Sequence, residues 1–198
     1  MRNEGSLDTA YYSYYIDDEF YDQLTQDIES FYGDFKPLQD RSIEDECRRL
    51  IYKEARLLDE LKLDEVLDLY SNQCLYWIPI TPGGGDPRKE VSHAFDDRRR
   101  LEDRIYRLKT GYAHSQIPMS RTRRMLTNIE FSQGNHVNEV RVRANFILYE
   151  LRTGTVRSYA GWYGYKVIKE NQEWKKVDLK MVNLIDCDQG HENLTFML

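Results

Sequence analysis

The segment VRVRANFIL, residues 140–148, decides the fold class of this chain. Alternate positions of this segment are apolar, and the positions between them start with basic and polar residues. The apolar set is Val140, Val142, Ala144, Phe146 and Leu148, and the other set contains Arg141, Arg143 and Asn145. Because successive side chains of a strand point to opposite faces, this alternation predicts a long strand with one face on a core.

Three more segments around this strand are rich in residues that favour β-structure. Together they give four predicted strands, at about 122–132, 137–151, 156–169 and 173–186. The connections are short and carry residues favoured in tight turns: Gly134, Asn135, Thr153, Gly154, Asn171 and Gln172. The last third of the chain therefore predicts an antiparallel meander of hairpins.

Helical periodicity dominates the sequence ahead of these strands. Apolar residues recur at helical spacing over 42–61, with Ser42 as the expected N-cap. A shorter helix is expected from 64 to about 70, followed by a strand over 73–80. A further helix is expected over 96–110, and it should end at a C-cap glycine, Gly111.

The segment between these last two elements, residues 81–90, is predicted to be an irregular loop. It contains three successive glycines and two prolines. No Gly-Lys-Ser/Thr follows the glycines, so a phosphate-binding loop is not indicated. Helices followed by a meander predict an α+β domain over 42–198, with the N-terminal helices packed in a curved, mainly antiparallel sheet that encloses a cone-shaped core.

Residues 1–41 are predicted to form an acidic, tyrosine-rich N-terminal extension. Residues 1–46 hold 13 acidic and 3 basic side chains, whereas the remainder holds 21 acidic and 25 basic ones. The tyrosines of the extension are Tyr11, Tyr12, Tyr14, Tyr15, Tyr21 and Tyr32. Disordered tails are usually poor in aromatic residues, so the extension should dock, either on a partner or on its own domain. The mixed signs of the body give little support to nucleic-acid binding.

The cysteines and the hydropathy of the chain give an expected location. Cys47, Cys74 and Cys187 are widely spaced and form no Cys-x-x-Cys pair, so each is expected to be a buried apolar residue. The first residues lack the apolar core of a signal peptide, and no run approaches the length of a membrane span. A cytoplasmic location is expected from these features.

The histidines do not form a recognisable catalytic or metal-binding motif. A Rieske cluster uses paired cysteines and histidines, and a mononuclear iron site uses two histidines and a carboxylate; neither local pattern occurs. His136 and His191 are expected to be exposed. His93 and His114 flank the 96–110 helix, and they could form an acid–base set with a nearby acidic or phenolic group. The candidates for that group are Asp96, Asp97 and Tyr76.

Two groups of arginines have different interpretations. The first, Arg98 to Arg100, lies among acidic residues on a predicted helix, where local ion pairs explain it. The second precedes a strand, so Arg121 and Arg123 should share one side. Arginine is favoured at protein interfaces, and a contact between subunits is as good an explanation as a plain surface strand.

Short motifs along most of the chain resemble those of the β (small) subunits of bacterial aromatic-ring-hydroxylating dioxygenases. The resemblance runs from about residue 45 to 198 in consistent order and spacing. Its positions are Tyr52, Glu54, Ala55, Leu57, Leu58, Asp59, Tyr76-Trp77-Ile78-Pro79, Asp86-Pro87, Ser92, Phe95-Asp96-Asp97, Leu101-Glu102-Asp103-Arg104-Ile105, Arg107-Leu108, Gly111, Pro118, Ser120-Arg121-Thr122, Asn128 and Asn193-Leu194-Thr195-Phe196 before Met197-Leu198. The long extension departs from the family pattern, as does His114, which stands where Trp is common.

This resemblance implies a fold like that of scytalone dehydratase and ketosteroid isomerase, and a structural role without catalytic, cofactor or metal residues in this chain. The implied partner is an iron-bearing α subunit with a Rieske [2Fe–2S] cluster and a mononuclear Fe(II), assembled as three α and three β subunits. Electrons from NAD(P)H would arrive through a reductase, with or without a ferredoxin. The complex would dihydroxylate an aromatic substrate with O2 in aromatic catabolism.

Five residues are expected to contribute to contacts with the α subunit or with other β subunits: Trp77, Arg121, Arg123, Phe196 and Leu198. Two alternatives stand beside the subunit interpretation. One is an independent dehydratase or isomerase of the same fold that uses His93, His114 and Asp96 or Asp97. The other is a binding module for a small apolar ligand or another protein.

Overall fold

The computed structural model describes residues 15–33, 35–191 and 194–198. In that part of the chain, four α-helices and six strands follow one another, with a short 3₁₀ helix, η2 (His114–Gln116), after the last α-helix. The α-helices are α1 (Asp18–Tyr32), α2 (Arg41–Asp59), α3 (Leu63–Leu67) and α4 (Arg98–Thr110). The strands are β1 (Tyr70–Pro79), β2 (Ser92–Asp97), β3 (Arg121–Gln133), β4 (Glu139–Arg152), β5 (Thr155–Glu170) and β6 (Glu173–Leu184).

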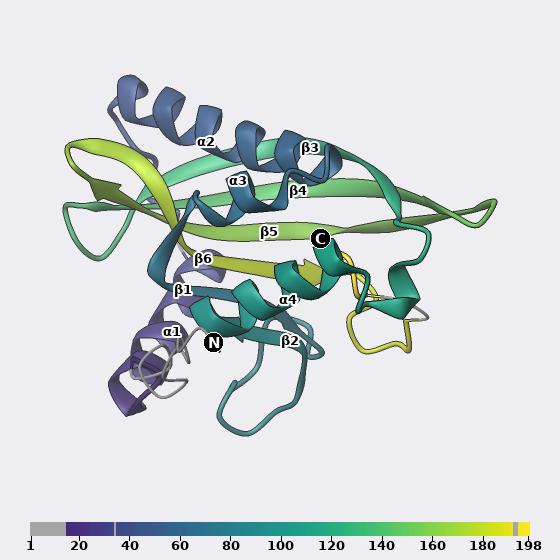
Figure 1. Ribbon diagram of the computed structural model, residues 1–198. Coiled ribbons are helices and arrows are strands. Elements are labelled where there is room, and N and C mark those ends of the chain that lie inside the picture. Colours follow the sequence, from purple (N-terminus) through teal and green to yellow (C-terminus); the bar gives the residue numbers. More distant parts are fainter. Residues whose placement is uncertain (1–14, 34, 192–193) are drawn as a thin grey trace, which may run out of the picture.

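The six strands form one curved sheet in the order β2-β1-β6-β5-β4-β3 (Figure 1). The pairs from β3 through β6 are antiparallel neighbours in sequence, which confirms the predicted meander. The hairpins turn at Thr153-Gly154 and Asn171-Gln172, all four with the positive φ that tight turns require. The pairing of β1 with β6 is parallel and joins the two halves of the sequence.

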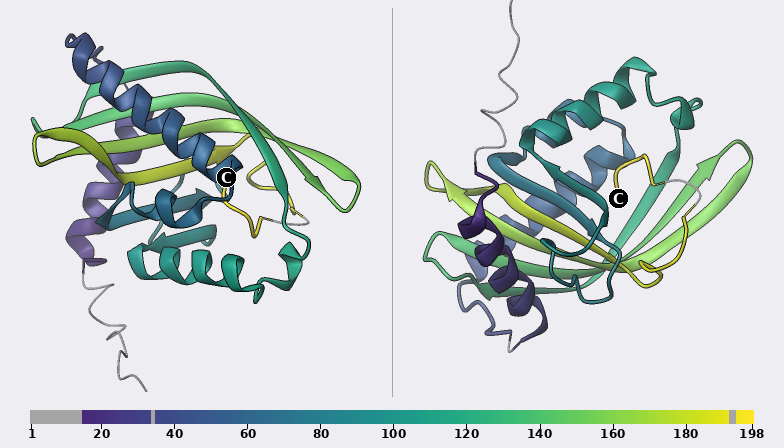
Figure 2. Two further views of the ribbon diagram at one scale, coloured as in Figure 1. Left: turned by 45° about the horizontal axis from the view of Figure 1, so that its top comes forward. Right: turned by 90° about the horizontal axis from the view of Figure 1, so that it is seen from below.

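The concave face of the sheet wraps around α2 and encloses the main core (Figure 2). On β4, the alternate residues from Val140 to Leu148 are buried, as their apolar pattern predicts. From α2 the core receives Cys47, Leu50, Ile51, Leu57 and Leu58. The α+β cone expected from the sequence is therefore confirmed, and all three cysteines are buried and unpaired within it.

The opposite, convex face of the sheet is covered in part by α1. Leu24, Ile28 and Phe31 of this helix pack against β1 and β6. The helix comes so close to β5 that a Cβ on Gly164 would lie 2.9 Å from the Phe31 ring. Of the two possibilities for the extension, the described part docks on its own domain. Tyr11, Tyr12 and Tyr14 lie outside the described residues.

Beneath α1, an ion cluster crosses the convex face. Asp27 is buried, with its carboxylate 2.6 Å from Arg141 Nη2 and 3.2 Å from Lys166 Nζ. Lys166 also pairs with Asp178 at 2.9 Å. Burial lowers the pKa of Lys166, but its two carboxylate neighbours outweigh that effect and raise it. The helix is thus held by buried charge pairs as well as by apolar contacts.

Three local predictions were wrong or incomplete. The side chain that caps α2 belongs to Asp40, which accepts hydrogen bonds from the backbone of Ser42, and not to Ser42 itself. The helix expected from 96 begins at Arg98, because the preceding residues form the short strand β2 against β1. The helix α1 was not predicted at all. By contrast, Gly111 ends α4 in the left-handed conformation expected of a C-cap glycine.

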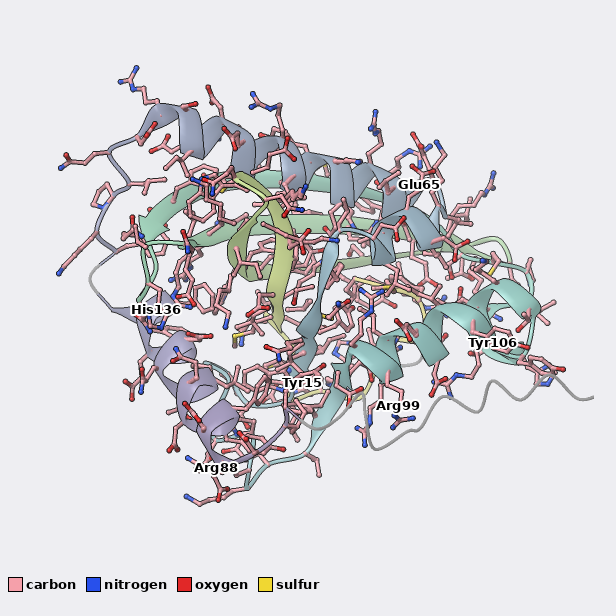
Figure 3. All side chains as sticks on the ribbon, turned by 60° about the vertical axis from the view of Figure 1, so that its left-hand side comes forward. Tyr15, Glu65, Arg88, Arg99, Tyr106 and His136 are labelled. Atoms are coloured by element: carbon pink, nitrogen blue, oxygen red, sulfur yellow. The ribbon has the colours of Figure 1, made fainter. Side chains whose placement is uncertain are left out.

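The arginine cluster on α4 forms the predicted local ion pairs. Arg98 Nε lies 2.7 Å from Glu102, and Arg99 Nη1 lies 3.2 Å from Asp103. The start of α4 is also tied to the extension, since Tyr15 accepts a hydrogen bond from the Arg98 backbone (Figure 3). Within the described residues, no helix has the length and apolar character needed to cross a membrane.

Candidate functional site

The interior of the cone is the space in which an enzyme of this fold would bind its substrate. In this chain, that interior contains a buried ion pair. Helix α2 places Glu54 there, with no exposed surface. Its carboxylate accepts hydrogen bonds from Lys180 Nζ at 2.7 Å, Tyr70 OH at 2.9 Å and Tyr165 OH at 3.3 Å. These partners come from β6, β1 and β5, so one carboxylate joins a helix to three strands.

Burial sets the proton affinities of this group. It lowers the pKa of Lys180 to about 8, although the nearby Glu54 carboxylate partly offsets the effect. Burial also raises the pKa of Tyr70 and Tyr165 well above 10, and the same carboxylate adds to that rise. At neutral pH, Lys180 therefore stays protonated and both phenols stay neutral, as donors to Glu54.

The segment 194–198 enters this interior and fills it. The backbone N–H of Leu198 donates to Tyr76 OH at 3.0 Å, and a main-chain oxygen of Leu198 accepts from Lys180 Nζ at 2.8 Å. The carbonyl of Met197 accepts a hydrogen bond from Arg124, which is itself paired with Asp59 at 2.5 Å. A substrate could reach Glu54 only if this segment left.

Aromatic side chains occupy the rest of the space. The rings of Phe146 and Tyr163 stack with centroids 4.0 Å apart, and Tyr159 meets Phe196 edge-on. A hollow of about 410 Å³ lies at the surface between α2 and β3, lined by Tyr52, Arg56 and Glu60 among others. The interior is thus a packed core rather than an open pocket.

The residues suggested for an acid–base set do not come together. His93 Nε2 lies 2.9 Å from the carbonyl of Cys187, and its ring contacts His191. His114 is exposed on η2, in a separate surface hollow of about 290 Å³. Asp96 is paired with Arg104 at 2.6 Å, and Asp97 caps α4. The hydroxyl of Tyr76 accepts a hydrogen bond from the backbone N–H of Leu198. The acid–base set named for the independent-enzyme alternative is therefore not assembled.

The other two histidines differ from each other. His136 is exposed in the β3–β4 connection, far from α4, as expected (Figure 3). The exposure predicted for His191 was wrong, because its side chain is only 8% exposed and packs between His93 and Tyr159. Over the ranges that the structure describes, no group of three or more His, Cys, Asp or Glu residues could hold a metal ion.

Three of the residues proposed for subunit contacts are buried within their own chain. Trp77 lies beneath α1, and its indole N–H donates to Ser92 Oγ at 2.8 Å. Phe196 and Leu198 lie inside the cone. Arg121 and Arg123 are exposed on β3. Of the five residues, these two arginines therefore have exposed side chains, and Arg123 Nη1 also donates to the backbone carbonyls of Asp59 and Thr122.

Arg121 and Arg123 adjoin an apolar area that the sequence analysis missed. On the convex face, Met125 pairs across strands with Ile147, and Arg123 pairs with Tyr149. Met125, Ile147 and Tyr149 are each between 44% and 49% exposed. Helix α1 covers the other half of this face and leaves these residues bare. We call Arg121, Arg123, Met125, Ile147 and Tyr149 the sheet patch.

A signal for the sheet patch was present in the alternation of β4, whose second set continues beyond Asn145 with Ile147 and Tyr149. Two apolar side chains on the outward face of a strand indicate a covered surface. The interior ion pair gave no such signal, because Glu54 and Lys180 lie 126 residues apart in sequence. Only the fold brings them together.

Comparisons with known proteins agree on one family. The family described as "Ring hydroxylating beta subunit" matches residues 53–188. The small oxygenase component of the p-cumate 2,3-dioxygenase system of Pseudomonas putida is 29% identical over 155 residues, which is 77% of this chain and 86% of that protein.

Solved structures extend the comparison to the fold. The β subunit of the benzoate 1,2-dioxygenase of Burkholderia mallei is 26% identical, with a TM-score of 0.62 over 76% of this chain and 95% of that chain. A proposed scytalone dehydratase from Novosphingobium aromaticivorans is 15% identical, with a TM-score of 0.53 over 71% and 83%. The second likeness shows the fold alone and agrees with the cone expected from the sequence.

Proposed function

Because this chain belongs to the ring-hydroxylating β-subunit family, we propose that it is the non-catalytic structural subunit of the terminal oxygenase of an aromatic-ring-hydroxylating dioxygenase. The observation that carries this proposal is the interior of the cone. The chain's own residues 194–198 fill the space where an enzyme of this fold would bind a substrate, and Glu54 is held by three donors. The chain would then contribute to the reaction by assembling with the subunit that carries the catalytic site.

The partner that we propose is an iron-bearing α subunit. It would hold the Rieske [2Fe–2S] cluster and the mononuclear Fe(II), and would receive electrons from NAD(P)H through a reductase, with or without a ferredoxin. Three α and three β subunits would form the complex, with β subunits also in contact with one another. The supply of NAD(P)H makes the cytoplasm its proposed location.

The sheet patch is the surface that we assign to a neighbouring subunit. Aromatic residues, methionine and arginine are enriched at interfaces, and Tyr149, Met125 and Arg121 supply all three kinds. The apolar side chains would be buried at the centre, while the guanidinium groups pair with carboxylates at the edge. Rings of subunits depend on such contacts for their geometry.

Aromatic carboxylates are the substrate class that we propose for the complex. Two relatives of this chain act, by name, on p-cumate and on benzoate, both of which are aromatic acids, whereas another acts on biphenyl, an uncharged arene. The substrate would bind to the α subunit, since the interior of this chain is filled. Oxygen uptake by the purified complex with benzoate, compared with an uncharged arene, tests this part.

The experiment that tests the subunit role is co-expression with the large oxygenase subunit from the same source. Native mass and iron content of the purified particle are measured together. We expect equal numbers of the two chains, with iron present. The variant Arg121→Ala should reduce the assembled fraction, because it removes a charged contact at the edge of the sheet patch, while the melting temperature of the isolated chain stays unchanged.

The matched control is Arg49→Ala, which removes an exposed arginine from α2, away from the convex face. It should assemble like the unmodified chain. An iron-free particle that contains only this chain would overturn the subunit role. Normal assembly of Arg121→Ala would remove only Arg121 from the proposed interface.

A further inference from the structure

The way in which the cone holds residues 196–198 resembles the way in which a receptor holds a peptide. These three residues are buried, with Leu198 having no exposed surface. Their main chain, rather than their side chains, makes the polar contacts. Tyr76 accepts from the Leu198 N–H at 3.0 Å, Lys180 donates to a main-chain oxygen of Leu198 at 2.8 Å, and Arg124 donates to the Met197 carbonyl.

The groups that make these contacts are fixed without the segment. Lys180 is paired with Glu54 at 2.7 Å, and Arg124 with Asp59 at 2.5 Å. Arg104 lies over the ring of Tyr76. Because each group is positioned by a neighbour outside 196–198, the site is organised in advance of its occupant, a condition that favours tight binding.

The charge of the interior indicates the class of occupant. Two cations, Lys180 and Arg124, face two carboxylates, Glu54 and Asp59, so these four groups carry no net charge when paired. Toward residues 197 and 198, Lys180 and Arg124 donate to main-chain oxygens, and Tyr76 accepts from an N–H. That set matches a peptide main chain with apolar side chains.

The rim of the cone has contacts of the same kind. Thr195 Oγ1 accepts hydrogen bonds from Gln116 Nε2 and from Ser115 Oγ, each at 3.0 Å. Phe196 then meets the Tyr159 ring, with centroids 5.5 Å apart. Four consecutive residues therefore follow a continuous track from the rim to the centre, held by groups on β1, β3, β5, β6 and η2.

We propose that the interior of the cone is a binding site for an apolar peptide segment, which residues 195–198 occupy from within the same chain and which accepts the same sequence from a separate molecule. A tethered segment competes at an effective concentration of about millimolar. A free peptide should therefore bind only when the tethered segment is weakened or cut.

The first test uses the full chain with Met197→Asp, which introduces a carboxylate into the apolar interior and should expel the segment. The probe is a fluorescent peptide with the sequence of residues 191–198, HENLTFML. We expect at least tenfold tighter binding by Met197→Asp than by the unmodified chain. Adding Tyr76→Phe should weaken binding about fivefold, the effect of one lost hydrogen bond. Equal binding by the first two chains, or no binding by a folded variant, would overturn the proposal.

A second test leaves residues 191–198 unaltered. A protease site is placed at Gly190, which is exposed and whose Cβ position has no neighbour within 4 Å, and the folded chain is then cut. Retention of the released octapeptide, its exchange for the labelled peptide, or restored folding on peptide addition each supports the site. Loss of the octapeptide without rebinding, or unfolding that the peptide does not reverse, contradicts it.

Discussion

At the scale of single residues, the pair of Glu54 and Lys180 is the unusual feature of this core. Both side chains have no exposed surface, and their charged atoms lie 2.7 Å apart. Removing charges from water is costly, and a buried pair of this kind contributes less to stability than its geometry suggests. Its clearer effect is on specificity, because α2 and β6 must be in register for both charges to be satisfied.

The low pKa of Lys180 predicts how its contribution to stability changes with pH. The folded chain holds this proton with a pKa of about 8, whereas the unfolded chain holds it with the ordinary value of 10.5. Between these values the unfolded state binds more protons, so rising pH favours the folded state. From pH 8 to 9.5, the free energy of unfolding should rise relative to Lys180→Met by up to about 1 kcal/mol per pH unit.

Urea denaturation of both proteins at several pH values measures this difference. Lys175→Met is the control, because Lys175 lies on the same strand and is 38% exposed. Its difference from the unmodified chain should stay flat over the same range. A Lys180→Met difference that is flat or falls with pH would show that the buried amine keeps its ordinary proton affinity.

At the scale of elements, the docking of α1 depends on one glycine of β5. A Cβ at position 164 would meet the Phe31 ring at 2.9 Å, so Gly164→Ala should push the helix off the sheet. We expect a loss of about 1–3 kcal/mol, typical of overpacking. Thermal unfolding measures the loss, and Phe31→Leu in the same chain should recover part of it. Gly190→Ala, with open space around it, serves as the neutral comparison.

The start of α2 gives a second prediction at this scale. Asp40 accepts the hydrogen bonds of the exposed N–H groups, so Asp40→Ala should cost about 0.5–2 kcal/mol of stability. Ser42→Ala, two residues on, should change little. Guanidinium titrations of the two variants decide between the caps. If Ser42→Ala lowers the free energy of unfolding more than Asp40→Ala does, the N-cap is Ser42, as the sequence pattern predicts.

Elements with a strong local period could be predicted from the sequence. The helix α2 and the four strands of the meander follow from apolar spacing and turn residues, and their ends are close to the predicted ones. The strand β2 could not be predicted in this way. It is six residues long and forms because Phe95 pairs with Trp77 on β1, a partner that is distant in the sequence.

The missed helix α1 is a different case, because its pattern was visible. Phe20, Leu24, Ile28 and Phe31 recur at helical spacing, and Asp17 is a good N-cap. The acidic charge and the tyrosines of the extension instead predicted a segment that docks, either on a partner or on its own domain, without a defined helix. Among the five residues predicted to contact other subunits, exposure could be predicted only where it depends on local sequence. The arginines of β3 follow a local strand pattern, whereas the burial of Trp77 depends on where α1 docks.

At the scale of the whole molecule, the bare sheet patch predicts the behaviour of the isolated chain. An exposed apolar area on a sheet favours association when its partner is absent. Ile147→Lys should therefore lower self-association of the isolated chain by about tenfold, the effect of 1.4 kcal/mol, and should also weaken assembly with the α subunit. Sedimentation velocity at several concentrations measures the first effect.

The control for this prediction is Val137→Lys, because Val137 is also exposed but lies in the β3–β4 connection, outside the sheet patch. It should leave both self-association and assembly unchanged. If Val137→Lys is as effective as Ile147→Lys, then added charge alone explains the result, and the sheet patch has no special role.

The parallel pairing of β1 with β6 has a consequence for synthesis on the ribosome. When β1 leaves the exit tunnel, the strand that it pairs with is about one hundred residues away, so roughly 5–20 s of translation pass before β6 exists. During that time, the apolar side chains of β1 and α1 lack the cover that Leu179 and Met181 of β6 supply. We therefore expect the nascent chain to bind chaperones until its last strand emerges, and slow codons before residue 173 to prolong that exposure.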